Sequence, residues 1–162
     1  MKHPRHAHLP HLFLKPGELF LSCDPAIVST VLGSCVSITF FEPVMRLGAM
    51  CHVMLPSGSR DDGFKYVDST LGYMVERIVA MGVRLASCEV KLFGGADVLM
   101  PRKPQGTRLS IGQQNILEAL RRLDVLGVVP KSCDVGGKHG RKLFFHSHTG
   151  DVFLKKVAKS IF

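Results

Sequence analysis

The chain has no tryptophan, no long hydrophobic run and no closely spaced pair of cysteines. A transmembrane helix needs roughly 18 or more consecutive apolar residues, and no stretch approaches that length. The first 17 residues contain charge and proline but no continuous apolar segment of the kind found in signal peptides. We therefore expect a soluble protein of the cytoplasm.

Five cysteines are present, an odd number, and none belongs to a Cys-x-x-Cys arrangement. This spacing argues against a disulfide framework and against a thiolate zinc site. A free cysteine is most often a small buried apolar residue. A functional cysteine in this chain must therefore be identified by its surroundings.

Positive charge is in excess, with 21 Lys and Arg against 13 Asp and Glu and a formal net charge of +8. Such an excess can indicate a nucleic-acid-binding protein. The basic residues are scattered along the chain, however, and no nucleic-acid-binding module is recognisable. The remaining interpretations are a solvated basic surface or a partner with an acidic face, toward which the charge would steer the protein.

The length of 162 residues and a hydrophobic content of 46% favour one domain with a substantial core. Residues 1–16, which include His3, His6, His8 and His11, predict a flexible N-terminal arm. Residues 17–162 are then expected to form the single folded domain.

Two segments have the periodicity of amphipathic helices. Apolar residues recur at helical spacing from 64 to 78, and Gly82 follows as a C-terminal cap. A second helix is predicted from Ser110, as N-cap, to Gly127. The apolar residues expected to face inward on this second helix are Ile111, Ile116, Leu117, Leu120 and Leu123.

Short β-prone runs occupy most of the remaining chain, at 19–21, 27–31, 36–40, 48–55, 88–93, 128–129, 141–145 and 152–157. The run 36–40 alternates apolar and polar residues, which predicts a half-buried strand. The expected fold class is α+β: a layered α/β/β sandwich with two long helices packed on a mostly antiparallel β-sheet core.

Cys35 and His52 lie on the two arms of one predicted hairpin. If Glu42 pairs with Leu47, the register places Cys35 diagonal to His52 on the same face of the sheet. Cys51 then points to the opposite face, toward the core. A thiol near a histidine can ionise below its free pKa of about 8.5 and become a useful nucleophile.

Gly33 lets the backbone turn sharply just before this cysteine. The N–H groups of Ser34 and Cys35 could then point into a cleft and stabilise the oxyanion of an acyl-transfer intermediate, an effect of about 3–4 kcal/mol per donor. The residues alone leave two interpretations open, a catalytic cysteine and an ordinary structural one.

The same segments resemble the CheD family of chemotaxis proteins, which are chemoreceptor glutamine deamidases. The resemblance extends from residue 17 to about 153, with His52 seventeen positions after Cys35. The motifs that carry it occur in a fixed order: LGSCV at 32–36, GAMCHVMLP at 48–56, KLFGGA at 91–96, IGQQN at 111–115, DVGG at 134–137, GR at 140–141 and TG at 149–150.

This resemblance implies a single CheD-like deamidase domain at 17–162 that converts glutamine side chains to glutamate on the cytoplasmic helices of methyl-accepting chemotaxis receptors. It implies Cys35 as the nucleophile and His52 as the general acid and base. The family's third polar residue, a threonine six positions before the cysteine, falls on Ser29. Thr30 follows it and would face the opposite side of the strand.

The implied mechanism is hydrolytic, through a cysteine thioester with ammonia release, with the oxyanion held by backbone N–H groups near Ser34 and no metal or organic cofactor. The resemblance also implies a possible adaptor role, since some members bind a CheC-type phosphatase. The candidate rim for such a partner consists of Phe93, Gly94, Gly95 and Ala96, where glycines would let a helix approach closely. The alternatives to deamidation are a non-catalytic adaptor and a protease-like or transglutaminase-like enzyme with the same acyl chemistry.

Overall fold

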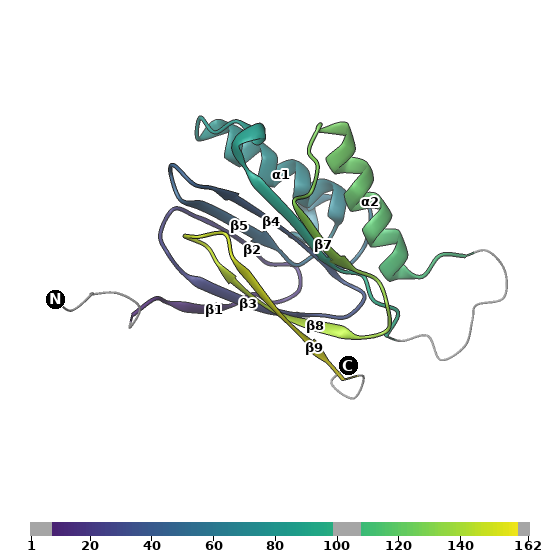
Figure 1. Cartoon of the computed structure of the whole chain (residues 1–162). Helices are drawn as coiled ribbons and strands as arrows, with labels where there is room; N and C mark the ends of the chain where they lie inside the picture. The colour runs from purple at the N-terminus through teal and green to yellow at the C-terminus, as the bar shows by residue number, and fades with distance from the viewer. Residues whose placement is uncertain (1–7, 99–107, 159–162) are drawn as a thin grey trace.

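The computed structural model describes residues 8–98 and 108–158, which form three layers (Figure 1). Two short 3-10 helices, Arg60–Asp62 and Leu85–Ser87, occur in connections. The α-helices and strands of the described part are, in chain order, β1 His11–Phe13, β2 Leu19–Ser22, β3 Ile27–Leu32, β4 Val36–Glu42, β5 Leu47–Cys51, α1 Val67–Ala80, β6 Glu89–Gly94, α2 Ile111–Val125, β7 Ser132–Val135, β8 Gly140–His146 and β9 Val152–Val157.

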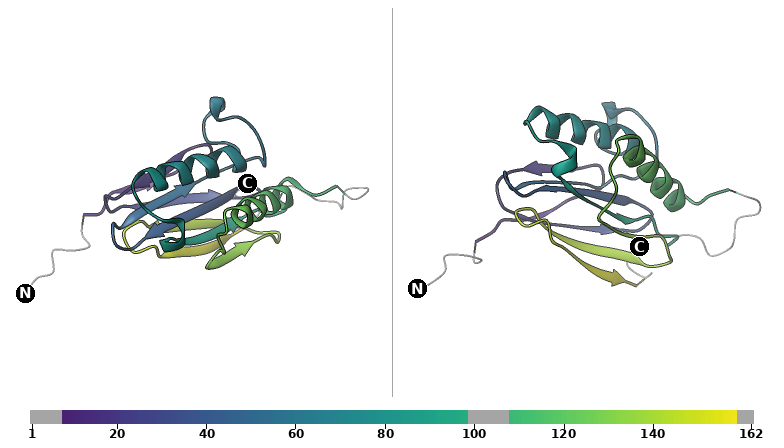
Figure 2. Two further views of the ribbon diagram at one scale, coloured as in Figure 1. Left: turned by 90° about the horizontal axis from the view of Figure 1, so that it is seen from above. Right: turned by 45° about the horizontal axis from the view of Figure 1, so that its top comes forward.

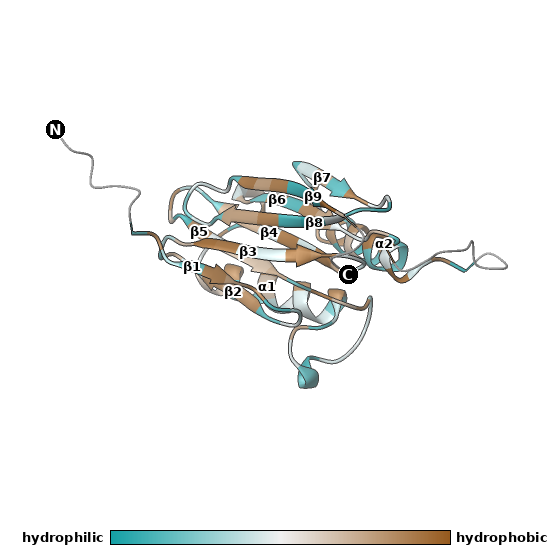
Figure 3. Ribbon diagram, turned by 90° about the horizontal axis from the view of Figure 1, so that it is seen from below, coloured by the Kyte–Doolittle hydropathy of each residue, from teal (hydrophilic) through white to brown (hydrophobic). Residues whose placement is uncertain are grey.

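The middle layer is a five-stranded sheet in the order β2-β5-β4-β6-β7. Both α-helices lie across one face of this sheet, as the view from above makes clear (Figure 2). A four-stranded sheet in the order β1-β3-β8-β9 covers the other face and is nearest the viewer in Figure 3. Pairing is antiparallel except between β1 and β3 and between β6 and β7. The predicted α/β/β sandwich is therefore confirmed.

The core is divided into two clusters by the five-stranded sheet. On the helix side, alternate residues of β4 pack with α1 side chains such as Leu71 and Met74. On the other side, Met50 of β5 packs against residues of the second sheet such as Leu32 and Phe145. Because both faces of β4 are covered, all seven of its residues are buried, and the predicted half-buried strand is wrong.

The bounds predicted for the two helices are close to those observed. Ser110 caps α2: its Oγ accepts from the Gln113 N–H at 3.1 Å, and the Gln113 side chain accepts from the Ser110 N–H at 3.0 Å. No helix in the described part of the chain is long and apolar enough to cross a membrane.

The inward face predicted for α2 is partly wrong. Ile111, Leu117 and Leu120 are exposed, whereas the buried positions are Gly112, Asn115, Ala119 and Leu123. Small residues occupy this face because the helix lies directly against the backbone that follows β6. A Cβ at position 112 would collide with the carbonyl oxygens of Gly95 and Ala96.

The predicted flexible arm is wrong for residues 11–14. β1 pairs in parallel with β3, and the Leu14 N–H donates to the Ser29 carbonyl at 2.8 Å. The Leu14 side chain is buried between the sheets. Residues 1–7 of the predicted arm, with His3 and His6, lie outside the described residues.

One predicted strand is misplaced. Residues 128–129 are not a strand, and Val129 is exposed, whereas β7 forms at Ser132–Val135. β7 exists because it pairs in parallel with the far edge of β6. That pairing is a long-range contact, which the polar residues of this segment do not indicate by themselves.

Candidate active site

The β4–β5 hairpin has the register expected from the sequence. Glu42 pairs with Leu47, and the ladder continues to Thr39 opposite Met50. An isolated bridge between Val36 and Val53 continues the same register beyond the ends of the two strands. The predicted register is therefore confirmed over the full length of the hairpin.

This register places Cys35 and His52 on one face of the hairpin, diagonal to each other, because side chains alternate along each strand. Cys51 lies on the other face, fully buried in the helix-side cluster, with its Sγ 3.4 Å from the Ile38 nitrogen. The predicted core role of Cys51 is confirmed. The shared face of Cys35 and His52 is directed toward the second sheet.

A strand of that second sheet supplies the partner of the His52 ring. Thr30 of β3 is completely buried, and its Oγ1 lies 2.7 Å from Nδ1 of His52. The same hydroxyl donates to the Leu14 carbonyl oxygen at 2.7 Å. A hydroxyl has one hydrogen and a carbonyl can only accept, so the Thr30 oxygen must accept from Nδ1–H. The Nδ1 tautomer leaves a lone pair on Nε2, where a general base needs it.

Ser29, predicted as the orienting residue, does not take this place. Residues of β3 alternate between buried and half-buried, and Ser29 is on the half-buried face that points away from the five-stranded sheet. The contact predicted for Ser29 is made by Thr30. The physical reason is the period-two alternation of a strand, which sends neighbouring side chains to opposite faces.

Burial keeps both members of the pair neutral. It lowers the pKa of His52 to about 4, with the Leu14 carbonyl acting weakly in the opposite direction. It also raises the pKa of the Cys35 thiol to about 11, against a smaller lowering by the backbone N–H of Cys35 itself. The thiolate that the sequence led us to expect is therefore not the resting form at neutral pH. A reaction in which this thiol acts as nucleophile would therefore have to remove its proton during attack rather than before it.

The loop that carries Cys35 is fixed by its carbonyl groups and leaves its N–H groups unused. The Cys35 carbonyl accepts from the Gly95 N–H at 2.8 Å, and the Gly33 carbonyl accepts from the Ala96 N–H at 2.9 Å. In the described part of the chain, the Ser34 N–H donates to no protein acceptor, and the Cys35 N–H has none besides its own thiol. Both are thus available as donors to an oxyanion.

The four residues of the predicted partner rim, Phe93, Gly94, Gly95 and Ala96, are buried, and Ala96 also lines a pocket of about 120 Å³ together with Ser34 and Gly112. The close helix approach expected there does occur, but the helix is the chain's own α2. A Cβ on Gly95 would collide with the side chain of Ile116 and approach the carbonyl oxygen of Gly112. These contacts show that the glycines serve the internal packing of α2 on the end of β6.

Asn115 of α2 lies within the IGQQN motif, and the sequence alone assigned it no role. Its Nδ2 donates to the carbonyl oxygens of Ser34 at 2.9 Å and of Met54 at 3.0 Å. A buried asparagine on an apolar helix face was the available signal, since such a polar group must find partners inside the protein.

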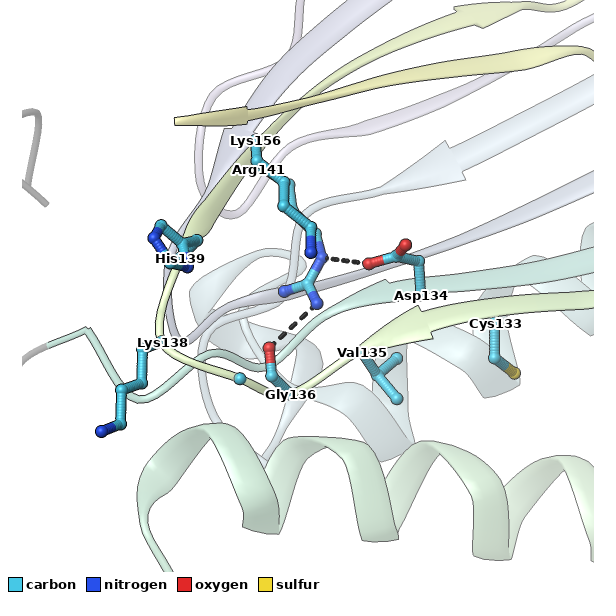
Figure 4. Close-up of a pocket in the computed structure, with 9 residues that line it drawn as sticks. Cys133, Asp134, Val135, Gly136, Lys138, His139, Arg141 and Lys156 are labelled. Carbon is cyan, nitrogen blue, oxygen red and sulfur yellow. Dashed lines mark hydrogen bonds and ion pairs between the residues drawn. The ribbon is translucent and has the colours of Figure 1, made fainter. Parts of the chain in front are cut away.

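A pocket of about 390 Å³ lies at the ends of β7 and β8, and Figure 4 shows the basic side chains on its wall. Cys35 and His52 do not line it. Arg141 is buried there and donates to Asp134 at 2.7 Å, to the Gly136 carbonyl at 2.9 Å and to the Gly94 carbonyl at 3.4 Å. These bonds hold the end of β6, next to the loop that contains Cys35.

Comparison with known proteins identifies relatives over nearly the whole chain. The family model described as CheD chemotactic sensory transduction matches residues 54–156. A protein of Geobacter sulfurreducens named probable chemoreceptor glutamine deamidase CheD 2 is 45% identical over 96% of each chain.

Proteins named probable chemoreceptor glutamine deamidase CheD in Maridesulfovibrio salexigens and Nitratidesulfovibrio vulgaris are 41% and 38% identical. The matches cover 93% and 94% of this chain and 94% and 80% of the respective relatives. Among solved structures, the Bacillus licheniformis hypothetical protein YfiH is 13% identical, with a TM-score of 0.40 over 67% of this chain and 46% of that one, a similarity too low to support an inference.

Proposed function

Because this chain belongs to the CheD family, we propose that it is a chemoreceptor glutamine deamidase with Cys35 as nucleophile and His52 as general acid and base. The reaction is the hydrolysis of a glutamine side-chain amide to glutamate and ammonia. The observation that carries the proposal is the hydrogen bond from Nδ1–H of His52 to the Thr30 hydroxyl. It leaves the basic nitrogen of a neutral imidazole on the face that His52 shares with Cys35.

The first step joins proton transfer to attack, because the thiol and the imidazole are both neutral at rest. Nε2 of His52 takes the proton from Sγ of Cys35 as the sulfur bonds to the Cδ atom of the glutamine. The amide oxygen becomes an oxyanion, which accepts hydrogen bonds from the N–H groups of Ser34 and Cys35.

The second step expels ammonia. The His52 imidazolium gives its proton to the amide nitrogen, because an unprotonated amide nitrogen is a poor leaving group. The C–N bond breaks, and the acyl group remains on Cys35 as a thioester.

Hydrolysis of the thioester completes the cycle. His52, neutral again, takes a proton from a water molecule as the water oxygen attacks the acyl carbon. The C–S bond breaks, the proton returns to the sulfur, and glutamate leaves. One water is consumed and one ammonia is released, so the protein is unchanged.

The proposed substrates are chemoreceptors, which the names of the relatives give as the targets of those proteins. Within them, the proposed sites are glutamines on the cytoplasmic helices of methyl-accepting chemotaxis receptors. The competing role is a non-catalytic adaptor that binds receptor helices or a CheC-type phosphatase. An adaptor would bind receptor without releasing ammonia, and its binding would not depend on the Cys35 sulfur.

The test is incubation with purified receptor cytoplasmic domains, with ammonia assayed in solution and the amide-to-acid mass change located by peptide mass spectrometry. The wild type should give both signals, and Cys35→Ala should give neither. Cys133→Ala, which removes an exposed cysteine on β7, is the matched control and should retain both. Deamidation by Cys35→Ala would contradict the proposal, and receptor binding by a wild type that releases no ammonia would favour the adaptor.

A further inference from the structure

Asn115 is the one residue of α2 whose side chain binds both chain segments of the proposed site. It is completely buried, and its two hydrogen bonds go to the Ser34 and Met54 carbonyl oxygens, 81 and 61 positions away in the sequence. Both partners can only accept, so the amide nitrogen must face them and the orientation of the amide group is fixed. Ser34 directly precedes Cys35, and Met54 is two positions beyond His52.

The position of Asn115 follows from how α2 begins. The capping box at Ser110 starts the helix, and Gly112 lets its first turn approach the backbone at Gly95 and Ala96. Asn115 is three residues after Gly112 and so lies on the same face of the helix. The close approach of the helix brings a short asparagine side chain within reach of the Cys35 loop.

The bond to Ser34 also determines the direction of the next N–H group. The Ser34 carbonyl and the Cys35 N–H belong to the same peptide unit, which is planar and trans, so the two groups point in opposite directions. Because Asn115 holds the carbonyl toward α2, the Cys35 N–H is directed away from α2. Apart from the Cys35 thiol itself, that N–H has no acceptor in the described part of the chain, so it can donate to a substrate oxygen.

We propose that Asn115 is a positioning residue for the deamidation reaction. It fixes the orientation of the Ser34–Cys35 peptide, so that the Cys35 N–H meets the oxyanion. Its second hydrogen bond holds the Met54 carbonyl, two positions after His52, close to the same peptide. This inference rests on the proposed function, since an oxyanion forms only if Cys35 attacks an acyl carbon.

The remaining atom of the Asn115 amide supports this role. Within the described residues its Oδ1 is buried and has no hydrogen-bond partner. An unsatisfied buried acceptor lowers stability, and an apolar residue of similar size would not carry it. The two N–H donors of Asn115 are therefore the feature that distinguishes it from a leucine at this position.

The test compares deamidation with alkylation of the same sulfur. Iodoacetamide reacts with Cys35 by displacement at a saturated carbon, which creates no oxyanion and so does not need the Cys35 N–H. Asn115→Ala should lower kcat for deamidation by about 10- to 100-fold. This is less than the roughly 100- to 1,000-fold lost when an oxyanion donor is removed, because the Cys35 N–H would be misdirected and not deleted. KM and the rate of Cys35 alkylation should each stay within about threefold of wild type, because substrate binding does not use Asn115 and burial, the main cause of the raised Cys35 pKa, is unchanged.

Gln114→Ala is the matched control. It removes a neighbouring amide on the same helix, whose nitrogen donates to the Leu109 carbonyl and not to the site. Its kcat should equal that of the wild type. Asn115→Leu keeps a side chain of similar size without the N–H donors. It should lose about as much activity as Asn115→Ala, and it provides the measurement if the alanine variant does not fold.

Unchanged kcat in a folded Asn115 variant would overturn the inference, as would a parallel loss of deamidation and Cys35 alkylation, which indicates a general loss of structure. Neither outcome contradicts the proposed function, provided that the wild type is active. If the wild type releases no ammonia, or if Cys35→Ala still does, the proposed function fails and this inference fails with it.

Discussion

Val36 and Val53 exchange two backbone hydrogen bonds, each N–H donating to the carbonyl oxygen of the other at 3.0 Å. Each valine directly follows one member of the proposed catalytic pair. The reciprocal bonds therefore fix the backbone separation of Cys35 and His52 at the point where the β4–β5 hairpin ends. The side chains of the valines lie in the helix-side cluster, so those of their preceding neighbours are directed to the opposite face.

The pH dependence of the rate should follow a neutral thiol and a neutral imidazole. The pKa of His52 is lowered to about 4 and that of Cys35 is raised to about 11, so kcat/KM should be flat across neutral pH and decline only toward those two values. Alkylation of Cys35 should behave differently and rise about tenfold per pH unit through the neutral range, because only the thiolate reacts. A bell-shaped profile with limbs between pH 5 and pH 9, roughly where unperturbed His and Cys titrate, would contradict this prediction and indicate a preformed ion pair.

Stability should fall on acidification because His52 is buried as the neutral ring. Its folded pKa of about 4 lies below the value of 6.5 for an unperturbed histidine. Between these values the unfolded chain binds a proton that the folded chain does not, so the free energy of unfolding decreases as pH falls, by about 3 kcal/mol over the window. Urea unfolding at a series of pH values measures this slope.

His52→Gln should remove this component of the slope. The matched control is His139→Gln, at an exposed histidine, which should retain it. Equal slopes in the wild type and in His52→Gln would show that the His52 ring does not titrate as burial requires.

Thr30→Val should lower kcat by about 10- to 100-fold, because it removes the acceptor that fixes the His52 tautomer. It should also lower the free energy of unfolding by about 1–3 kcal/mol, since the buried Leu14 carbonyl loses its donor. Thr30→Ser should restore most of the activity. Ser29→Ala is the control one position away, and a larger loss of kcat there than in Thr30→Val would reverse our assignment.

Gly94→Ala should disturb the Cys35 loop. The φ angle of Gly94 is +106°, and a Cβ at this position would collide with the Cys35 carbonyl oxygen. We expect a loss of about 2–3 kcal/mol in the free energy of unfolding together with reduced kcat. Gly82→Ala is matched in backbone conformation, with φ +82°, but has open space around it. Gly82→Ala should lower the free energy of unfolding by about 1–2 kcal/mol and leave kcat normal. Urea unfolding and a steady-state assay measure the two effects.

Local patterns in the sequence were sufficient for a large part of the fold. Helical periodicity and the Ser110 cap predicted both α-helices, because these signals come from neighbours within a few residues. The assumed pairing of Glu42 with Leu47 across a short connection proved correct, and with it the shared face of Cys35 and His52. The failures included β1, β7, the burial of both faces of β4 and the inward face of α2, each of which depends on a partner distant in the chain.

The sequence by itself determined which residues we propose as the catalytic pair, since the spacing of Cys35 and His52 and the order of the surrounding motifs are properties of the chain. Only the tertiary structure decided that Thr30 rather than Ser29 meets the imidazole, because the answer depends on which face of β3 is packed against the other sheet. The protonation states and the Asn115 contacts were likewise decided by packing. Desolvation and hydrogen bonds across some 80 positions arise only when the layers come together.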